Sequence, residues 1–363
     1  MGERLRFEIV VPVRLKSLRH ATAGCLLLLS CFASWAQSPA VHSSSLQSLL
    51  QSGQADFEAG QYSQAAGSFE RARQTAPDSL PANRGLVLSY LQLGRLDEAG
   101  RIGEEAVTRW PRDAQLQHWL GLVYFKSGQI GAAQSTLQRS EALDGGRFDI
   151  HFDLALVLLQ QNQFGAAADE LEKAVKLDPS QSLAHVLLGR AYQNSNRTLQ
   201  AVQQFQAALR ADPNTPLGHY HLAFAYASLG RNDEAIAEYE KELVRAPQNA
   251  QVVSQLGHCL LEAGKLKEAI IHLKKATELD PSNADSAYDL GKALLLDGDA
   301  EAAAAALQRS IKLKPGDASP HYQLARALER MGQTEAAQEE WKRFAELKKN
   351  EAEVGGMASG RTQ

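Results

Sequence analysis

The sequence is poor in cysteine. Its 363 residues include only Cys25, Cys31 and Cys259. If the first 36 residues are removed, as argued below, Cys259 alone remains, and a lone thiol can form neither an internal disulfide nor a cysteine-based zinc site. The chain must therefore owe its stability to packing. Its composition of 44% hydrophobic and 22% charged residues is that of an ordinary globular protein.

An excess of basic charge is also missing. The formal net charge is −4, whereas phosphate-binding proteins usually show a basic excess on one face. No stripe of Lys and Arg runs along the chain, so we expect no nucleic-acid partner. The sequence contains no phosphate-binding loop, nucleophile elbow or HExxH motif. We therefore predict a protein that is not an enzyme and that needs no cofactor.

The first 36 residues form a separate segment. Basic residues between Arg4 and Arg19 precede an uncharged stretch from Ala21 to Ala36. Ser34 and Ala36 are the small residues that precede a signal-peptidase cleavage site. We predict that residues 1–36 are a signal peptide and that the exported chain, periplasmic or secreted, begins at Gln37.

Two alternatives remain open for this segment. It could stay uncleaved as a membrane anchor, although its apolar core is shorter than the roughly 20 residues of a membrane span. Alternatively, Leu28-Leu29-Ser30-Cys31 resembles a bacterial lipobox, which would leave Cys31 lipidated at the mature N-terminus. We expect membrane contact only through an N-terminus of one of these two kinds.

From Leu46 onward the sequence repeats every 34 residues without an insertion or deletion. The nine repeats are residues 46–79, 80–113, 114–147, 148–181, 182–215, 216–249, 250–283, 284–317 and 318–351. Counted within each repeat, position 20 is always Ala, position 15 is Gly or Asn, position 7 is Leu in eight repeats, and position 32 is Pro in seven. We predict a polar linker at residues 37–45 and a disordered tail at residues 352–363.

Each conserved column has a physical reason. Gly and Asn most readily enter the left-handed backbone region, so position 15 ends a first helix, helix A, in a tight turn. Ala at position 20 indicates that the backbones of helix A and a second helix, helix B, approach too closely for a longer side chain. The Leu column forms an apolar stripe at helical spacing, and Pro at position 32 stops helix B. One hairpin cannot bury its apolar face alone, but a stack of hairpins can.

These columns match the tetratricopeptide repeat pattern, and residues 46–351 resemble that family nine times in phase. The resemblance implies an all-α fold, a right-handed α-solenoid of nine helix-turn-helix repeats. It also implies that the A helices line a concave surface through side chains near positions 2, 5, 9, 12 and 13.

Several of these concave-face positions carry large apolar or basic side chains, which are typical of a binding surface. We predict a groove for a protein or peptide, with an apolar or helical peptide held between Leu122 and Phe224. Arg190, Lys292 and Arg326 would pair with carboxylates of the partner. The alternative is that these side chains merely fill the space against the neighbouring A helix. The predicted groove residues are Leu122, Phe125, Phe152, Leu156, Arg190, Tyr220, Phe224, Tyr288, Lys292, Tyr322 and Arg326.

Four histidines share position 4 and invite a metal hypothesis: His151, His185, His219 and His321. Neighbouring A helices lie about 8–10 Å apart or more, whereas zinc needs each nitrogen at about 2.0–2.1 Å. Equivalent histidines of successive repeats therefore cannot share one ion, and we predict a packing role and no metal site. Cys259 lies in a column of small residues and should be buried, and Asn196, although in a glycosylation sequon, occupies the turn position.

Three functions agree with these observations. The first is a scaffold or assembly factor of the cell envelope that holds a protein partner. The second is a membrane-tethered lipoprotein that resembles pilus- or secretin-assembly repeat proteins. The third is a recognition subunit of an envelope enzyme such as a transferase.

Overall fold

The computed structural model describes the backbone of residues 40–359 and the side chains of residues 45–352. Within this range the chain is all-α, with eighteen helices and no strand, which confirms the predicted fold class. The predicted signal peptide and Cys31 lie outside the described residues.

The helices alternate between the A and B elements of the repeat. The A helices are α1 (Ala40–Glu58), α3 (Leu80–Gln92), α5 (Ala114–Lys126), α7 (Phe148–Gln160), α9 (Ser182–Asn194), α11 (Gly218–Ser228), α13 (Ala250–Glu262), α15 (Ala284–Asp297) and α17 (Ala318–Arg330). The B helices are α2 (Tyr62–Thr75), α4 (Leu96–Arg109), α6 (Ile130–Leu143), α8 (Phe164–Leu177), α10 (Thr198–Ala211), α12 (Asn232–Arg245), α14 (Leu266–Leu279), α16 (Ala300–Leu313) and α18 (Thr334–Ser359).

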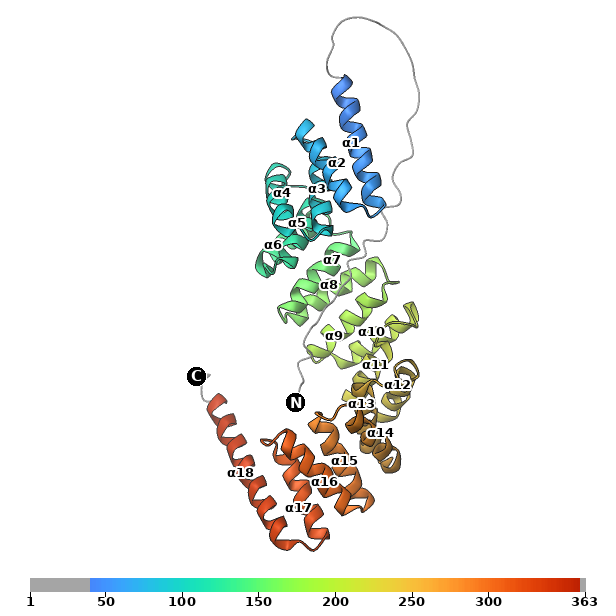
Figure 1. The fold of residues 1–363 in the computed structure, drawn as a ribbon, viewed down its shortest axis with the longest axis vertical. Helices are drawn as coiled ribbons and strands as arrows, with labels where there is room; N and C mark the ends of the chain where they lie inside the picture. The colour runs from blue at the N-terminus through green and yellow to red at the C-terminus, as the bar shows by residue number, and fades with distance from the viewer. Residues whose placement is uncertain (1–39, 360–363) are drawn as a thin grey trace, which may run out of the picture. The chain divides into compact units, whose positions relative to one another are not determined.

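The chain divides within α8 into two compact units, the first ending at Glu170 and the second beginning at Leu171. Within each unit, consecutive helices pack together as hairpins (Figure 1). Each A helix also packs against the A helix of the next repeat in the same unit. Each unit is thus a stack of hairpins with one row of A helices.

The turn between helices A and B has one backbone conformation throughout. Position 15 has a positive φ in all nine repeats, between 58° at Asn162 and 100° at Gly298. Asn196 has a φ of 59°, so the turn itself accounts for an Asn at this sequon. The predicted left-handed helix ends are therefore confirmed.

The interface between helices A and B is closely packed. Ala at position 20 is at most 1% exposed in every repeat, and the Leu column at position 7 is at most 9% exposed. Position 8 of helix A is Gly in five repeats, and a Cβ at Gly121 or Gly257 would lie 2.7 Å from the buried leucine at position 24 of helix B. Small residues on both helices thus allow the close approach that the Ala column predicted.

Two recurrent polar contacts join the helices. Tyr at position 11 hydrogen-bonds position 25 of the preceding B helix, as in Tyr124 Oη to Glu104 Oε1 at 2.9 Å and Tyr192 Oη to Glu172 Oε1 at 2.6 Å. The side chain at position 4 contacts the turn before its own helix, so that Gln117 donates to the carbonyl of Pro111 at 3.3 Å. The first contact joins one repeat to the next, and the second joins helix A to the turn before it.

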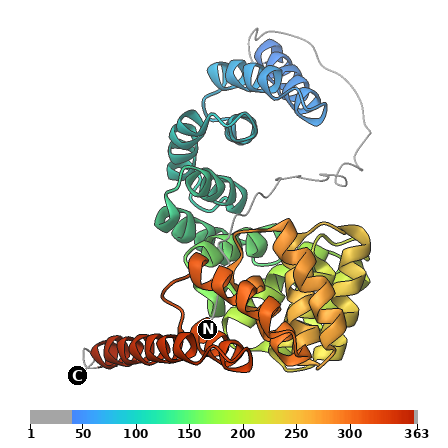
Figure 2. The same ribbon diagram turned by 60° about the horizontal axis from the view of Figure 1, so that its bottom comes forward.

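Three helix ends differ from the prediction. Helix α1 begins at Ala40, so residues 40–45 of the predicted linker are helical, because no Pro or Gly interrupts them. Helix α18 runs to Ser359, well into the segment predicted to be disordered (Figure 2). The ninth repeat has Lys349 where seven others have the Pro that stops helix B. Helix α11 begins at Gly218, after Pro216 and a left-handed Leu217 with φ 55°.

Two glycine substitutions test the packing at position 8. Gly121→Ala would place a Cβ 2.7 Å from Leu137 Cγ, and we expect it to lower the free energy of unfolding by about 1–3 kcal/mol. Gly67→Ala, in α2 with no atom within 4 Å of the new Cβ, should raise it by roughly 0.5–1 kcal/mol. Urea denaturation followed by circular dichroism measures both. Equal effects of the two substitutions would contradict a packing role for position 8.

Candidate peptide-binding face

The A-helix face of each unit carries the predicted groove residues. In the first unit, Leu122 and Leu156 are 4% exposed, while Phe125 and Phe152 are half-buried. In the second unit, Tyr220 is 5% and Tyr322 38% exposed. The half-buried residues there are Arg190, Phe224, Tyr288, Lys292 and Arg326. The aromatic residues other than Tyr220 therefore offer more surface to a ligand than Leu122, Leu156 or Tyr220.

In the second unit, many side chains on this face contact the next A helix. Gln251 donates to Tyr220 Oη at 2.7 Å, and the hydroxyls of Ser254 and Ser286 lie 2.7 Å apart. Lys292 Nζ lies 2.8 Å from Glu262 Oε1. The predicted cation of Lys292 thus already has a carboxylate partner, and positions 2, 5 and 9 contribute to the contacts between repeats.

Burial perturbs the ionisable groups of this row. Desolvation lowers the pKa of Arg190, and desolvation together with the charge of Arg190 lowers the pKa of His221 to about 3. His258 behaves oppositely, because its Nδ1 lies 2.9 Å from Asp289 Oδ2 and this hydrogen bond raises the pKa of His258. The only described cysteine, Cys259, is 1% exposed, and burial raises the pKa of its thiol to about 12. Its predicted core role is confirmed.

The first unit contains an open groove on its A-helix face. Its cavity of about 240 Å³ lies among the first three A helices and is lined by Leu50, Gln54, Phe57, Phe69, Pro81, Arg84, Gly85, Leu88, Gln115 and Trp119. Phe69, Leu88 and Trp119 are nearly buried, at 4%, 7% and 6% exposure, and Leu50 and Phe57 are half-buried. We call this set of residues the α1–α3–α5 groove.

The groove exists because one glycine lies among the large apolar side chains that line it. Gly85 contributes no side chain, and a Cβ there would lie 2.5 Å from the Phe69 ring, so Phe69 of α2 reaches the face from beneath. A guanidinium lies at the edge: Arg84 Nε donates to Asp113 Oδ1 at 3.3 Å, and Asp113 accepts from Leu116 N at 2.8 Å to cap α5. The groove is thus apolar within, with amides and one paired guanidinium around it.

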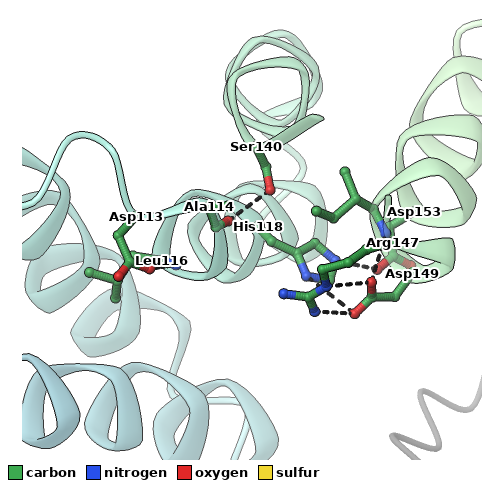
Figure 3. Close-up of polar contacts among 9 residues, drawn as sticks. Asp113, Ala114, Leu116, His118, Ser140, Arg147, Asp149 and Asp153 are labelled. Atoms are coloured by element: carbon green, nitrogen blue, oxygen red, sulfur yellow. Dashed lines mark hydrogen bonds and ion pairs between the residues drawn. The ribbon is translucent and has the colours of Figure 1, made fainter. Parts of the chain in front are cut away.

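A polar cluster joins α5 to α7 (Figure 3). His118 is fully buried, and its Nε2 lies 2.7 Å from Asp153 Oδ2. Its Nδ1 has no hydrogen-bond partner and lies 3.8 Å from Asp149 Oδ2. Burial opposes the ionisation of Asp149, but a hydrogen bond from Arg147 and the charge of His118 lower its pKa. The carboxylates of Asp149 and Asp153 thus have their partners within the cluster.

The position-4 histidines connect helices, as the sequence predicted. Nδ1 of His185 lies 2.8 Å from Gln204 Oε1, that of His219 lies 2.5 Å from Glu238 Oε2, and that of His321 lies 2.6 Å from Glu340 Oε2. In each case the partner is on helix B of the same repeat.

His151 makes the same contact with an addition. Its Nδ1 lies 2.7 Å from Glu170 Oε2 and 3.7 Å from Glu141 Oε1, and its Nε2 donates to the carbonyl of Gly145 at 2.9 Å. The three ligand-type atoms lie within 4.8 Å of one another. Histidine spacing alone does not reveal this cluster, because its other two members are carboxylates that reach one histidine from the B helices α6 and α8.

The α1–α3–α5 groove lies outside the region predicted from the sequence, which stays a separate prediction. The columns at positions 5, 9 and 12 contain Leu50, Arg84, Leu88 and Phe57, whereas the predicted peptide-binding region runs from Leu122 to Phe224. Trp119 and Gly85 occupy position 6, which was not considered. The pairing of a Gly and a Trp in that column was the available signal.

Among the described residues, no helix is both long and apolar enough to cross a membrane.

The pH dependence of stability tests the contact between His258 and Asp289. Because this contact raises the pKa of His258, its stabilisation is full below the unfolded pKa of about 6.5 and is lost as pH rises through the folded pKa. We expect Asp289→Asn to lower the thermal midpoint at pH 6 by more than at pH 8. The control Ser286→Ala, which removes a neutral hydrogen bond, should cost the same at both values. A loss in Asp289→Asn that does not vary with pH would contradict this assignment.

Comparison with protein families gives two matches. A tetratricopeptide repeat family matches residues 50–114, 120–182 and 186–250, more than half of the chain. The middle TPR-like domain of cilia and flagella-associated protein 70 matches residues 219–351. No curated protein matches the sequence.

Solved structures are similar in fold. The APC/C hetero-tetramer Cut9-Hcn1 is 18% identical with a TM-score of 0.47, covering 74% of this chain and 52% of that one, so the chain spans about half its length. YrrB, described as a TPR protein with an unusual peptide-binding site, is 23% identical with a TM-score of 0.47 over 51% of this chain and 96% of its own. MamA from Desulfovibrio magneticus RS-1 is 19% identical with a TM-score of 0.45 over 47% and 96%.

Proposed function

The chain belongs to the tetratricopeptide repeat family, and we propose that it is a non-catalytic scaffold that binds a protein or peptide on its A-helix face. The observation that carries this proposal is the open apolar cavity of about 240 Å³ in the α1–α3–α5 groove. Repeat proteins of this kind use the row of inner helices as an extended binding surface.

The chemistry of the groove favours a peptide with a large apolar side chain. Burying a Leu or Phe side chain there contributes about 1.5–3 kcal/mol, and Phe57 and Trp119 offer ring faces to pack against. Gln54 and Gln115 carry amides that can both donate to and accept from a peptide backbone. Arg84 favours a ligand carboxylate at the edge, in exchange for part of its contact with Asp113.

The originally predicted residues remain a second part of the proposal. Phe125 and Phe152 in the first unit, and Phe224, Tyr288 and Tyr322 in the second, retain surface on the same face. A longer partner would contact these rings beyond the groove. The buried Leu122, Leu156 and Tyr220 would act by supporting them.

We also propose that the protein works outside the cytoplasm, in the cell envelope or secreted. The support is the sequence of residues 1–36, with basic residues, an apolar core and small residues before Gln37. A tethered form lipidated at Cys31, assisting pilus or secretin assembly, and a recognition subunit of an envelope transferase are the alternative proposals.

Peptide selection tests the groove. We expect a library of displayed random peptides, selected on the chain, to yield sequences with a large apolar residue that bind with micromolar dissociation constants. Leu50→Glu should weaken them at least tenfold, about 1.4 kcal/mol, because it puts a carboxylate into the apolar wall. The control Leu143→Glu changes a 41% exposed residue of α6 outside the groove and should leave affinity unchanged. Equal binding by both variants would rule out the groove as the binding site.

Mass spectrometry of the mature N-terminus tests export. We expect the native protein to begin at Gln37, because Ser34 and Ala36 suit signal peptidase. An acylated Cys31 would support the tethered form instead. A chain that retains Met1 to Ala36 would contradict cleavage.

A further inference from the structure

Three ligand-type side chains converge in the first unit at the junction of the third and fourth repeats. Glu141 comes from α6, His151 from α7 and Glu170 from α8, and their side chains are 23%, 3% and 11% exposed. From these residues we propose that the chain binds one divalent transition metal ion, of the Zn²⁺ class, between Nδ1 of His151 and the two carboxylates.

The orientation of His151 is the first argument. A carbonyl can only accept, so Nε2 carries a proton toward the Gly145 carbonyl at 2.9 Å. A donor bond from the second ring nitrogen to a carbonyl is the arrangement that fixes metal-ligating histidines. Nδ1 then faces Glu170 Oε2 at 2.7 Å and Glu141 Oε1 at 3.7 Å, so the free lone pair of the ring and two carboxylate oxygens point to one place.

Comparison with the other repeats is the second argument. His185, at the same position, faces the amide of Gln204, and His219 and His321 each face the glutamate at position 23 of their own helix B. The residue equivalent to Glu141, at position 28, is Val107, Val175, Leu209, Leu243, Thr277, Ile311 or Ala345 in seven other repeats, and Arg73 in the first. A helix link alone therefore needs no carboxylate at this position. His at position 4 together with Glu at position 23 occurs in the fourth, sixth and ninth repeats, and only in the fourth does the preceding repeat carry a carboxylate at position 28.

The distances suit a small ion. Ligand atoms at about 2.0–2.1 Å from a tetrahedral zinc lie about 3.4 Å apart. The two nitrogen-to-oxygen distances here, 2.7 and 3.7 Å, bracket that value, and all three atoms lie within 4.8 Å of one another. Small side-chain rotations would complete the coordination. Glu141, the most exposed of the three, leaves room for a water as fourth ligand.

One imidazole and two carboxylates suit a transition metal better than Ca²⁺ or Mg²⁺, which prefer oxygen ligands alone. The ion would hold three helices, α6, α7 and α8, at one point. Its role would be structural, distinct from the peptide groove and independent of it.

Titration calorimetry of the metal-stripped full chain with ZnCl₂ tests the proposal. We expect one saturable site with a dissociation constant in the micromolar range or below, and a rise in thermal midpoint on adding Zn²⁺. Glu141→Gln should weaken binding at least tenfold. His151→Gln should also weaken Zn²⁺ binding at least tenfold. It should keep the hydrogen bond to the carbonyl of the preceding turn, because Gln117 makes the equivalent bond in the preceding repeat. The control His185→Gln changes the equivalent histidine of the fifth repeat and should leave Zn²⁺ binding unchanged.

Two results would overturn the site. One is a wild-type chain that shows no saturable Zn²⁺ binding. The other is binding that neither Glu141→Gln nor His151→Gln weakens, which would assign the ion to other residues. The circular dichroism of each variant is compared with that of the wild type, so that a failure to fold is not taken for a loss of binding.

Discussion

The close approach of helices A and B within each hairpin is the constraint on which the rest of the structure depends. Ala at position 20 is essentially unexposed in every repeat, and several repeats add a Gly at position 8 of the facing helix. A methyl group at Gly121 would already collide with Leu137. The large side chains at positions 7 and 24 are buried around this close contact. There they form the apolar layers of each stack.

Much of this could be derived from the sequence because the repeat occurs nine times in phase. Asn196 alone would be weak evidence for a left-handed turn. Gly or Asn occurs at position 15 of every repeat, however, which strongly predicts this turn, and all nine residues have a positive φ. Where a single repeat departs from the pattern, the averaged prediction failed. Helix α18 continues to Ser359 because Lys349 replaces the terminating Pro, and α11 starts late because Leu217 adopts a left-handed conformation.

The candidate groove was harder to predict, for a physical reason. Periodicity shows which positions face the inner surface, but not whether the side chains of adjacent A helices fill the space between them. In the second unit Tyr220 contacts Gln251 and Lys292 contacts Glu262. Residues at inner-face positions there are therefore used for contacts between neighbouring A helices. Among the first three A helices the combination of Gly85 with Phe69 and Trp119 leaves a cavity. Such a cavity depends on the volumes of the particular side chains that lie side by side. A comparison of equivalent positions between repeats does not show which side chains these are.

The same reasoning explains why function in a repeat stack lies in departures from the repeat. A residue that recurs in every hairpin, such as Ala at position 20, is explained by the stack itself. Glu141 and Gly85 do not recur in this way, since the stack is built without a carboxylate at position 28 and without a glycine at position 6 in other repeats. One lies beside a histidine that already has a carboxylate partner, and the other borders an apolar cavity. Gly85 makes room for the Phe69 ring and leaves the cavity beside it, whereas Glu141 adds a carboxylate that the packing of the other repeats does without. Both departures therefore mark places where the stack can bind a ligand.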